Sequence, residues 1–243
     1  MVWIEPDWPA PSWVRAASTT RRGGLSRGPY AGWNLGDHVG DDPAAVAANR
    51  ALLRERLALP AEPLWLRQVH GCTVAEGEGG CEADAALALG PGQVCAVLTA
   101  DCLPLLLCDR AGTRVAAVHA GWRGLAAGVI EAAIARLGAA PAELLVWMGP
   151  AIGADAFEVG DEVRRAFLAD GSTGADTAFR PSPNGRWLAD LYALAASRLR
   201  ALGVTEVRGG GLCTYADTER FFSYRRDGVT GRMASLVWIE PRG

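Results

Sequence analysis

Hydrophobic positions along the chain fall into two patterns, which predict strands and helices that alternate. Continuous apolar runs are typical of strands covered on both faces. Strands are expected over residues 14–20, 94–98, 103–108, 113–119, 144–148 and 233–239. Apolar residues at helical spacing predict helices over 43–59, 125–137, 161–168 and 188–202. This alternation predicts an α+β (mixed α/β) fold: a single layered domain over residues 1–243, with buried β-sheets flanked by helices.

The strands over 103–108 and 113–119 are expected to pair as an antiparallel hairpin. The turn at 109–112 has Asp first and Gly fourth, which suits a type I turn. With an even-length turn, Cys102 and His119 would lie directly opposite each other, with Cβ atoms about 5 Å apart. A bulged three-residue loop would shift this register by one residue.

Composition indicates a globular protein and excludes several function classes. The chain has 243 residues, half of them hydrophobic, and a net charge of −3 with both signs interspersed, so no nucleic-acid partner is expected. It has no lysine, which excludes Schiff-base enzymes and lysine-dependent P-loops. No apolar run reaches membrane-spanning length and the start lacks signal-peptide features, so we expect a cytoplasmic protein with no membrane partner. Its six cysteines form no CxxC pair and are expected to be reduced.

Three short polar segments interrupt the apolar runs and hold two of the three histidines and a cysteine. The segments are 68–71, 99–102 and 119–124. Two imidazoles and a thiolate are ligands that zinc prefers, and three protein ligands leave a position for water or substrate. We therefore expect His70, Cys102 and His119 to bind Zn²⁺ at a catalytic site. Alternation over 64–70 predicts a strand that places Gln68 and His70 on one face.

Two alternatives remain open for these residues. Cys102 and His119 would also serve as a nucleophile–base pair without metal. Asp101 is expected either to orient Cys102 or carry a proton, or to cap the strand end. His38 lies in an aspartate-rich loop and is expected to be a turn residue rather than a ligand.

Arginines near the predicted helix start indicate an anion site. Arg123 just precedes that helix, where N–H groups and the helix dipole favour phosphate; the alternative is packing on Trp122. Arg21, Arg225 and Arg226 are candidates of the same kind.

The same segments resemble the YfiH-like family, also called the laccase-domain or polyphenol oxidase family. The resemblance is carried by QVHG at 68–71, TADCLP at 99–104 and HAGWRG at 119–124, with further matching segments at 19–24, 34–41, 149–153, 157–160 and 222–227. It implies a layered α/β fold shared with a cytotoxic-factor cysteine hydrolase. It also implies zinc ligands at His70, Cys102 and His119. Within the matching segments, we assign substrate or phosphate binding to Arg21, Asn34, Gln68, Arg123, Tyr224 and Arg225.

For activity, the resemblance implies a purine nucleoside phosphorylase that splits adenosine, inosine, guanosine or methylthioadenosine and deaminates adenosine at the same zinc site. Phosphate held by zinc and Arg123 would attack C1′ while Asp101 protonates the purine; Cys102 and His119 complete the expected catalytic set. The His-x-Glu signature of zinc deaminases is absent. The partners are then a small nucleoside and phosphate, and the protein a monomer or weak dimer.

Two further functions follow from the resemblance. Some bacterial members are linked to peptidoglycan-precursor editing, which is our second hypothesis. Multicopper oxidation is implausible, because four coppers require about ten histidines and the chain has three. Copper is expected only as a substitute ion that gives incidental polyphenol oxidation.

Overall fold

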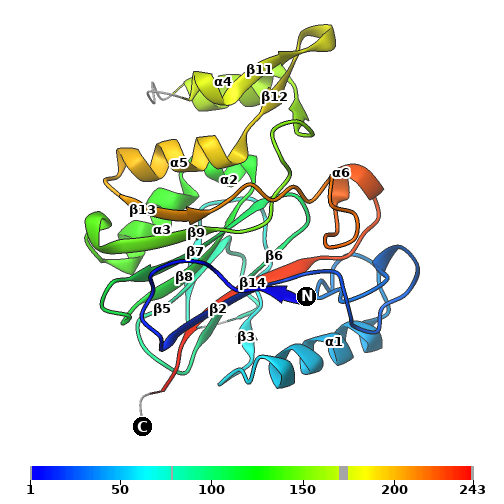
Figure 1. Cartoon of the computed structure of the whole chain (residues 1–243), viewed down its shortest axis with the longest axis vertical. Helices are drawn as coiled ribbons and strands as arrows, with labels where there is room; N and C mark the ends of the chain where they lie inside the picture. Colours follow the sequence, from blue (N-terminus) through cyan, green and yellow to red (C-terminus); the bar gives the residue numbers. More distant parts are fainter. Residues whose placement is uncertain (1, 78, 170–174, 242–243) are drawn as a thin grey trace.

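The computed structural model describes residues 2–77, 79–169 and 175–241, which fold into four layers (Figure 1). Two β-sheets pack face to face in the middle. Helix α1 (Pro43–Arg56) covers the outer face of one sheet. Helices α2 (Trp122–Ala127), α3 (Val129–Leu137) and α5 (Leu191–Ala201) cover the outer face of the other. The observed architecture confirms the α+β prediction.

The first sheet has five strands and the second has six. The order of the first is β1 (Trp3–Ile4), β2 (Val14–Thr19), β14 (Met233–Ile239), β6 (Val94–Thr99) and β3 (Pro63–Leu64). The order of the second is β13 (Glu206–Gly209), β9 (Leu144–Met148), β7 (Leu103–Asp109), β8 (Val115–Ala120), β5 (Ala85–Ala88) and β4 (Val74–Glu76). Neighbouring strands are antiparallel except for the pairs β3–β6, β4–β5 and β9–β13.

Both faces of the central strands are buried, which explains their continuous apolar sequences. In β6, Val94, Ala96 and Leu98 pack toward α1, whereas Cys95 and Val97 pack between the two sheets. Neither face meets water, so no polar residue is needed at alternate positions.

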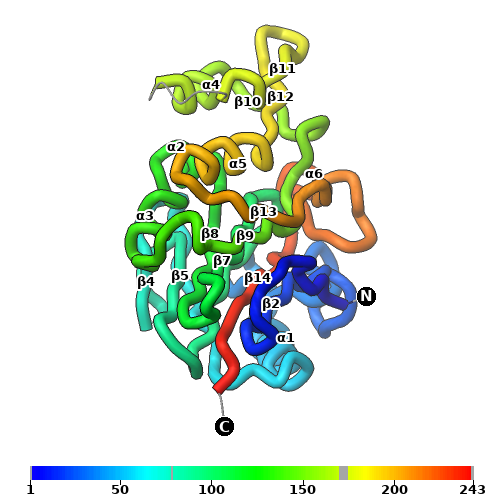
Figure 2. Tube along the Cα trace, turned by 60° about the vertical axis from the view of Figure 1, so that its left-hand side comes forward, coloured from blue at the N-terminus to red at the C-terminus, as the bar shows by residue number. Residues whose placement is uncertain are grey.

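A smaller unit forms one end of the molecule, beyond α2 and α5 (Figures 1 and 2). It consists of α4 (Asp161–Leu168) and a sheet in the order β10 (Glu158–Val159), β12 (Arg186–Ala189) and β11 (Phe179–Ser182). Val163 and Phe167 of α4 pack into the core that α2, α3 and α5 share. No helix in the described ranges is long and apolar enough to cross a membrane.

Three predicted helices differ from the observed ones. The helix over 43–59 ends at Arg56, three residues early. The helix over 125–137 begins earlier, at Trp122, so Arg123 lies in its first turn and not before it. It is broken at Gly128, whose left-handed φ of 99° ends α2 and precedes α3. The helix over 188–202 begins only at Leu191, because residues 188 and 189 belong to β12. The Asp190 side chain caps α5 by accepting a hydrogen bond from Ala193 N at 3.0 Å.

The predicted hairpin is confirmed as an antiparallel β7–β8 pair, but its predicted register is wrong. His119 lies opposite Pro104, two residues from the predicted Cys102. The Asp109 carboxylate accepts a hydrogen bond from Arg114 N at 3.1 Å, while Asp109 N donates to Arg114 O at 3.2 Å. These bonds close a four-residue loop over 110–113, one residue later than the predicted turn. The displacement shifts the pairing by two residues and leaves Cys102 just before the strand.

Candidate metal centre

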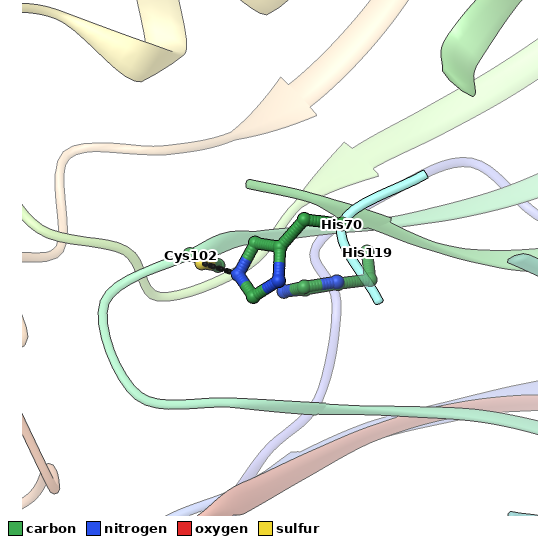
Figure 3. Close-up of side chains that lie close together, drawn as sticks. All are labelled: His70, Cys102 and His119. Atoms are coloured by element: carbon green, nitrogen blue, oxygen red, sulfur yellow. Dashed lines mark hydrogen bonds between the residues drawn. The ribbon is translucent and has the colours of Figure 1, made fainter. Parts of the chain in front are cut away.

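Two histidines and a cysteine from separate parts of the chain meet at one point (Figure 3). His119 lies in β8, Cys102 on the segment that joins β6 to β7, and His70 on the loop after β3. Their ligand atoms all lie within 4.8 Å of one another. Cys102 Sγ lies 3.7 Å from His70 Nε2, and the two imidazole rings meet edge to face with centroids 4.7 Å apart.

This donor set fits a zinc ion. Tetrahedral zinc with bonds of about 2.0–2.3 Å places its ligand atoms roughly 3.3–3.8 Å apart. The 3.7 Å separation of Cys102 Sγ and His70 Nε2 lies within that range. This pair therefore has the spacing of two ligands of one ion, and the ligand atom of His119 lies within 4.8 Å of both.

His70 reaches the site through a strained loop, and the predicted strand over 64–70 is wrong. Strand β3 ends at Leu64, and His70 has a φ of 61° in the left-handed region. The loop bends here because its backbone N–H groups at Val69, His70 and Gly71 all point to the carboxylate of Asp84. Hydrogen bonding to a buried carboxylate thus overrides the alternating pattern.

Cys102 lies where the chain passes from the five-stranded sheet to the six-stranded sheet. Its neighbour Asp101 has a φ of 91° and accepts hydrogen bonds on both carboxylate oxygens, from Thr214 Oγ1 at 2.6 Å and from Arg225 N at 2.7 Å. The Asp101 carbonyl accepts from Ile152 N at 2.9 Å. Asp101 therefore anchors the crossing segment that carries Cys102.

The charges of Cys102, His119 and Asp84 depend on one another. Burial favours the neutral thiol of Cys102, but the charge and hydrogen bond of His119, with a hydrogen bond from His70, outweigh it and lower the pKa to about 6. Burial would lower the pKa of His119, but Cys102 and Asp84 together raise it to about 9. Burial would raise the pKa of Asp84, but hydrogen bonds from His119 and Gly71 keep it below its usual value. Without metal, the geometry favours a thiolate beside an imidazolium.

The three ligands open into a cavity of about 540 Å³, a size typical of small-molecule sites. Its charged and polar lining comprises His38, Gln68, His70, Thr99, Asp101, Cys102, His119, Arg123, Tyr224, Arg225 and Arg232. This lining holds three arginines but only one carboxylate, that of Asp101. Both oxygens of Asp101 already accept hydrogen bonds from the protein. The lining therefore favours an anionic ligand.

Four residues predicted to bind substrate line this cavity. The Arg123 guanidinium stacks on Trp122 at 4.5 Å and also borders the cavity, so both expected roles are compatible with its position. Arg225 donates to Glu158 O at 2.8 Å, and Tyr224 is exposed at the rim, in the short helix α6 (Tyr224–Asp227). Gln68 exchanges two hydrogen bonds with the backbone of Leu98, which ties the His70 loop to β6.

Arg21 and Asn34 are not among the residues that line the cavity. The Arg21 guanidinium lies 4.7 Å above the Phe222 ring. Asn34 is fully buried; its amide donates to Gly36 O and Asp41, and its oxygen accepts from Arg232 N at 2.8 Å. Asn34 thereby supports the backbone of a lining arginine.

Sequence reasoning missed three residues at the centre. Arg232 lines the cavity and precedes β14, and His38 lines it although a turn role was expected. Asp84 is fully buried behind His119. Two of these residues could have been noticed in the sequence. Arg232 and Asp84 are each a charged residue directly before an apolar run that forms a strand.

Fold and site together define a layered α+β protein with a His/Cys/His group suited to a metal at an arginine-lined cavity. The chain belongs to the family described as multi-copper polyphenol oxidoreductase laccase, whose model matches residues 15–240. A purine nucleoside phosphorylase of Pseudomonas aeruginosa is 59% identical over 241 residues, which cover 98% of each chain. The purine nucleoside phosphorylase YfiH of Escherichia coli is 52% identical over 240 residues, which cover 97% of this chain and 98% of the relative.

Solved structures agree with this assignment. A crystal structure of a Neisseria meningitidis protein of the DUF152 family matches with a TM-score of 0.95 and 49% identity, covering 99% of this chain and 100% of that one. YlmD from Geobacillus stearothermophilus matches with a TM-score of 0.91 and 30% identity, covering 99% and 97%. The resemblance to the YfiH-like family is thereby confirmed.

Proposed function

We propose that the chain is a zinc-dependent purine nucleoside phosphorylase that acts on adenosine, inosine, guanosine and methylthioadenosine and deaminates adenosine at the same site. The observation that carries this proposal is the His70, Cys102 and His119 group at the base of a cavity whose charged lining is mainly arginine. The names of the relatives from Pseudomonas aeruginosa and Escherichia coli support the reaction class.

Phosphorolysis needs a phosphate held beside the scissile bond. Arg123 is exposed to the cavity and has no ion-pair partner among the described residues, so its planar guanidinium is available for two phosphate oxygens. Arg232 adds positive charge, while its guanidinium donates to Thr230 O and Gly231 O and so stays fixed. These two arginines would orient the anion without rearrangement.

In the reaction, a phosphate oxygen forms a bond to C1′ as the bond from C1′ to the purine nitrogen breaks. The electron pair leaves with the purine, which takes up a proton, and ribose 1-phosphate forms. A zinc ion held by His70, Cys102 and His119 would supply Lewis-acid polarisation of a bound oxygen. In deamination, water replaces phosphate, attacks C6 of adenine, and ammonia leaves.

Protonation of the purine is the role proposed for Asp101. Its two oxygens accept hydrogen bonds from Thr214 and Arg225, so it would have to hold the extra proton within that network. Asp101→Asn tests the role. If Asp101 is the acid, kcat falls and its pH profile changes; a purely anchoring role would lower stability without a change in that profile.

The decisive experiment is a product assay on the zinc-loaded protein. Adenosine, inosine, guanosine and methylthioadenosine are each incubated with and without inorganic phosphate. We expect free base and a pentose 1-phosphate only when phosphate is present, and inosine plus ammonia from adenosine without it. Elemental analysis should find about one zinc per chain, and Cys102→Ala should lose it.

Arg123→Gln separates phosphate binding from nucleoside binding. Loss of a charge-assisted hydrogen bond costs about 1.5–3 kcal/mol, so the KM for phosphate should rise roughly 10- to 100-fold with little change for the nucleoside. Arg22→Gln is a matched control, because Arg22 is exposed and pairs with Glu219 away from the cavity. An unchanged phosphate KM in Arg123→Gln would remove Arg123 from the phosphate site.

A second candidate rests on the metal-free arrangement of Cys102, His119 and Asp84, in which a thiolate, an imidazolium and a carboxylate form a chain. This arrangement suits a cysteine hydrolase, and we propose peptidoglycan-precursor editing as its function. Intact nucleosides in the product assay, with cleavage of a muramyl-peptide precursor by metal-free protein, would favour it. Copper in place of zinc would give only incidental phenol oxidation.

We also propose that the protein works in the cytoplasm as a monomer or weak dimer. All six cysteines lie in the described part of the chain and none is in a disulfide there, which suits a reducing compartment. Sedimentation at several concentrations tests the oligomeric state.

A further inference from the structure

One buried carboxylate contacts both histidine-bearing segments of the metal centre. Asp84 is fully buried and its side chain accepts four hydrogen bonds. Oδ1 accepts from His119 Nδ1 at 2.8 Å and His70 N at 2.9 Å. Oδ2 accepts from Gly71 N at 2.7 Å and Val69 N at 3.2 Å. The Asp84 carbonyl also accepts from His119 N at 2.7 Å, so its main chain and side chain hold the same histidine.

We propose that Asp84 is the positioning residue of the metal centre, which sets the tautomer of His119 and the backbone conformation of His70 together. With Nδ1–H of His119 donated to Asp84, the lone pair of Nε2 is left for an ion. The three N–H groups around Oδ1 and Oδ2 hold His70 at its φ of 61°, with its Nε2 beside Cys102. This inference rests on the metal assignment in the proposed function.

Only a carboxylate satisfies this arrangement. Each oxygen faces two donors, and an ionised carboxylate has about four acceptor positions. An asparagine amide would fail in either orientation. With its oxygen toward His119, its NH₂ faces the N–H groups of Gly71 and Val69. With its NH₂ toward His119, Nδ1 must accept and the proton moves to Nε2, which removes the lone pair that an ion needs.

The test compares Asp84→Asn with Asp109→Asn. Asp109 is also a buried carboxylate with several donors, from Thr113 and Arg114, but it closes the β7–β8 loop away from the ligands.

Zinc affinity is measured by chelator competition, and the site is observed in the absorption spectrum of the Co²⁺-loaded protein. We expect Asp84→Asn to bind zinc roughly 10- to 100-fold more weakly with an altered Co²⁺ spectrum. Asp109→Asn should lose thermal stability but keep the affinity and spectrum of the wild type.

The zinc-loaded wild type gives a readout that does not depend on a variant folding. In its NMR spectrum, the His119 Nδ1 proton should appear as a slowly exchanging, hydrogen-bonded imidazole proton. Coordination of His119 through Nδ1, or wild-type affinity and spectrum in folded Asp84→Asn, would overturn the role of Asp84 and leave the zinc assignment standing. If the wild-type protein binds no zinc, both the role of Asp84 and the zinc assignment are overturned.

Discussion

At the residue scale, the site depends on side chains that change one another's charge. Cys102 is partly exposed in the cavity, but its thiol is held beside His119 and His70. A thiolate in this position is a ready ligand for metal and a nucleophile without it. The metal-free protein therefore has a distinct chemical signature.

We predict that, in metal-free protein, iodoacetamide alkylates Cys102 faster than Cys72. The pKa of Cys102 is lowered to about 6, so its thiolate predominates at neutral pH and is lost as the pH falls through about 6. The pKa of Cys72, by contrast, is raised by burial and the charge of Asp84. Peptide mapping by mass spectrometry across pH 5–9 measures both rates. Equal pH midpoints for the two thiols, or no protection of Cys102 by added zinc, would contradict this account.

The sequence pointed to the three residues that meet at the candidate metal centre, but not to the residues that hold them in place. Two imidazoles and a thiolate indicate a metal by their chemistry alone, so His70, Cys102 and His119 could be predicted without a structure. Asp84 acts on His119 from 35 residues away, through a loop whose course no local pattern describes. Arg232 lines the cavity because the chain returns to the site just before its last strand, β14. The topology of the sheets determines this return, and no local sequence pattern indicates it.

At the element scale, the start of α2 packs closely against the candidate metal ligands His70 and Cys102. A Cβ placed on Gly121 would lie 2.8 Å from His70 Cδ2 and 2.9 Å from Cys102 Sγ. The backbone of Gly121 is ordinary, with φ −65° and ψ 155°, so side-chain space rather than backbone freedom requires glycine here.

We predict that Gly121→Ala loses most of its zinc while remaining folded, because the added methyl group displaces two ligands. Gly90→Ala is the matched control, since a Cβ at Gly90 meets nothing within 4 Å. Metal content after dialysis and circular dichroism measure the two effects. Full zinc occupancy in Gly121→Ala would show that the His70 loop can move aside.

Long buried strands could be predicted from their composition, whereas register and short strands could not. Apolar sequence on both faces marks β6, β7, β8, β9 and β14. It gives no information on which residues pair, and the Asp109 hydrogen bonds at the loop decided the register of β7 and β8. Strands such as β13 and β10 have four and two residues, too few for a periodic pattern to show.

At the scale of the whole molecule, the layers share their cores. Strands β7 and β8 pack on helices with one face and on the five-stranded sheet with the other. Loss of either sheet would expose the remaining one.

We predict that residues 1–243 unfold as a single domain in one cooperative transition. Trp147 reports on the core between the sheets, and Trp33 on the core beneath α1. Fluorescence and far-ultraviolet circular dichroism should therefore give the same Tm. Two separated transitions would show that the layers are independent domains.

The position of Cys102 between the two sheets has a thermodynamic consequence. His70, Cys102 and His119 meet only when both sheets are in place, so an unfolded chain offers no comparable site. An ion bound by them would therefore be a ligand of the folded state alone. Mass action then links its concentration to stability: at about 100 times Kd it contributes about 2.7 kcal/mol. For a chain of this size, that corresponds to a rise in Tm of roughly 5–10 °C. The supply of metal would then affect the stability of the fold as well as the occupancy of the site.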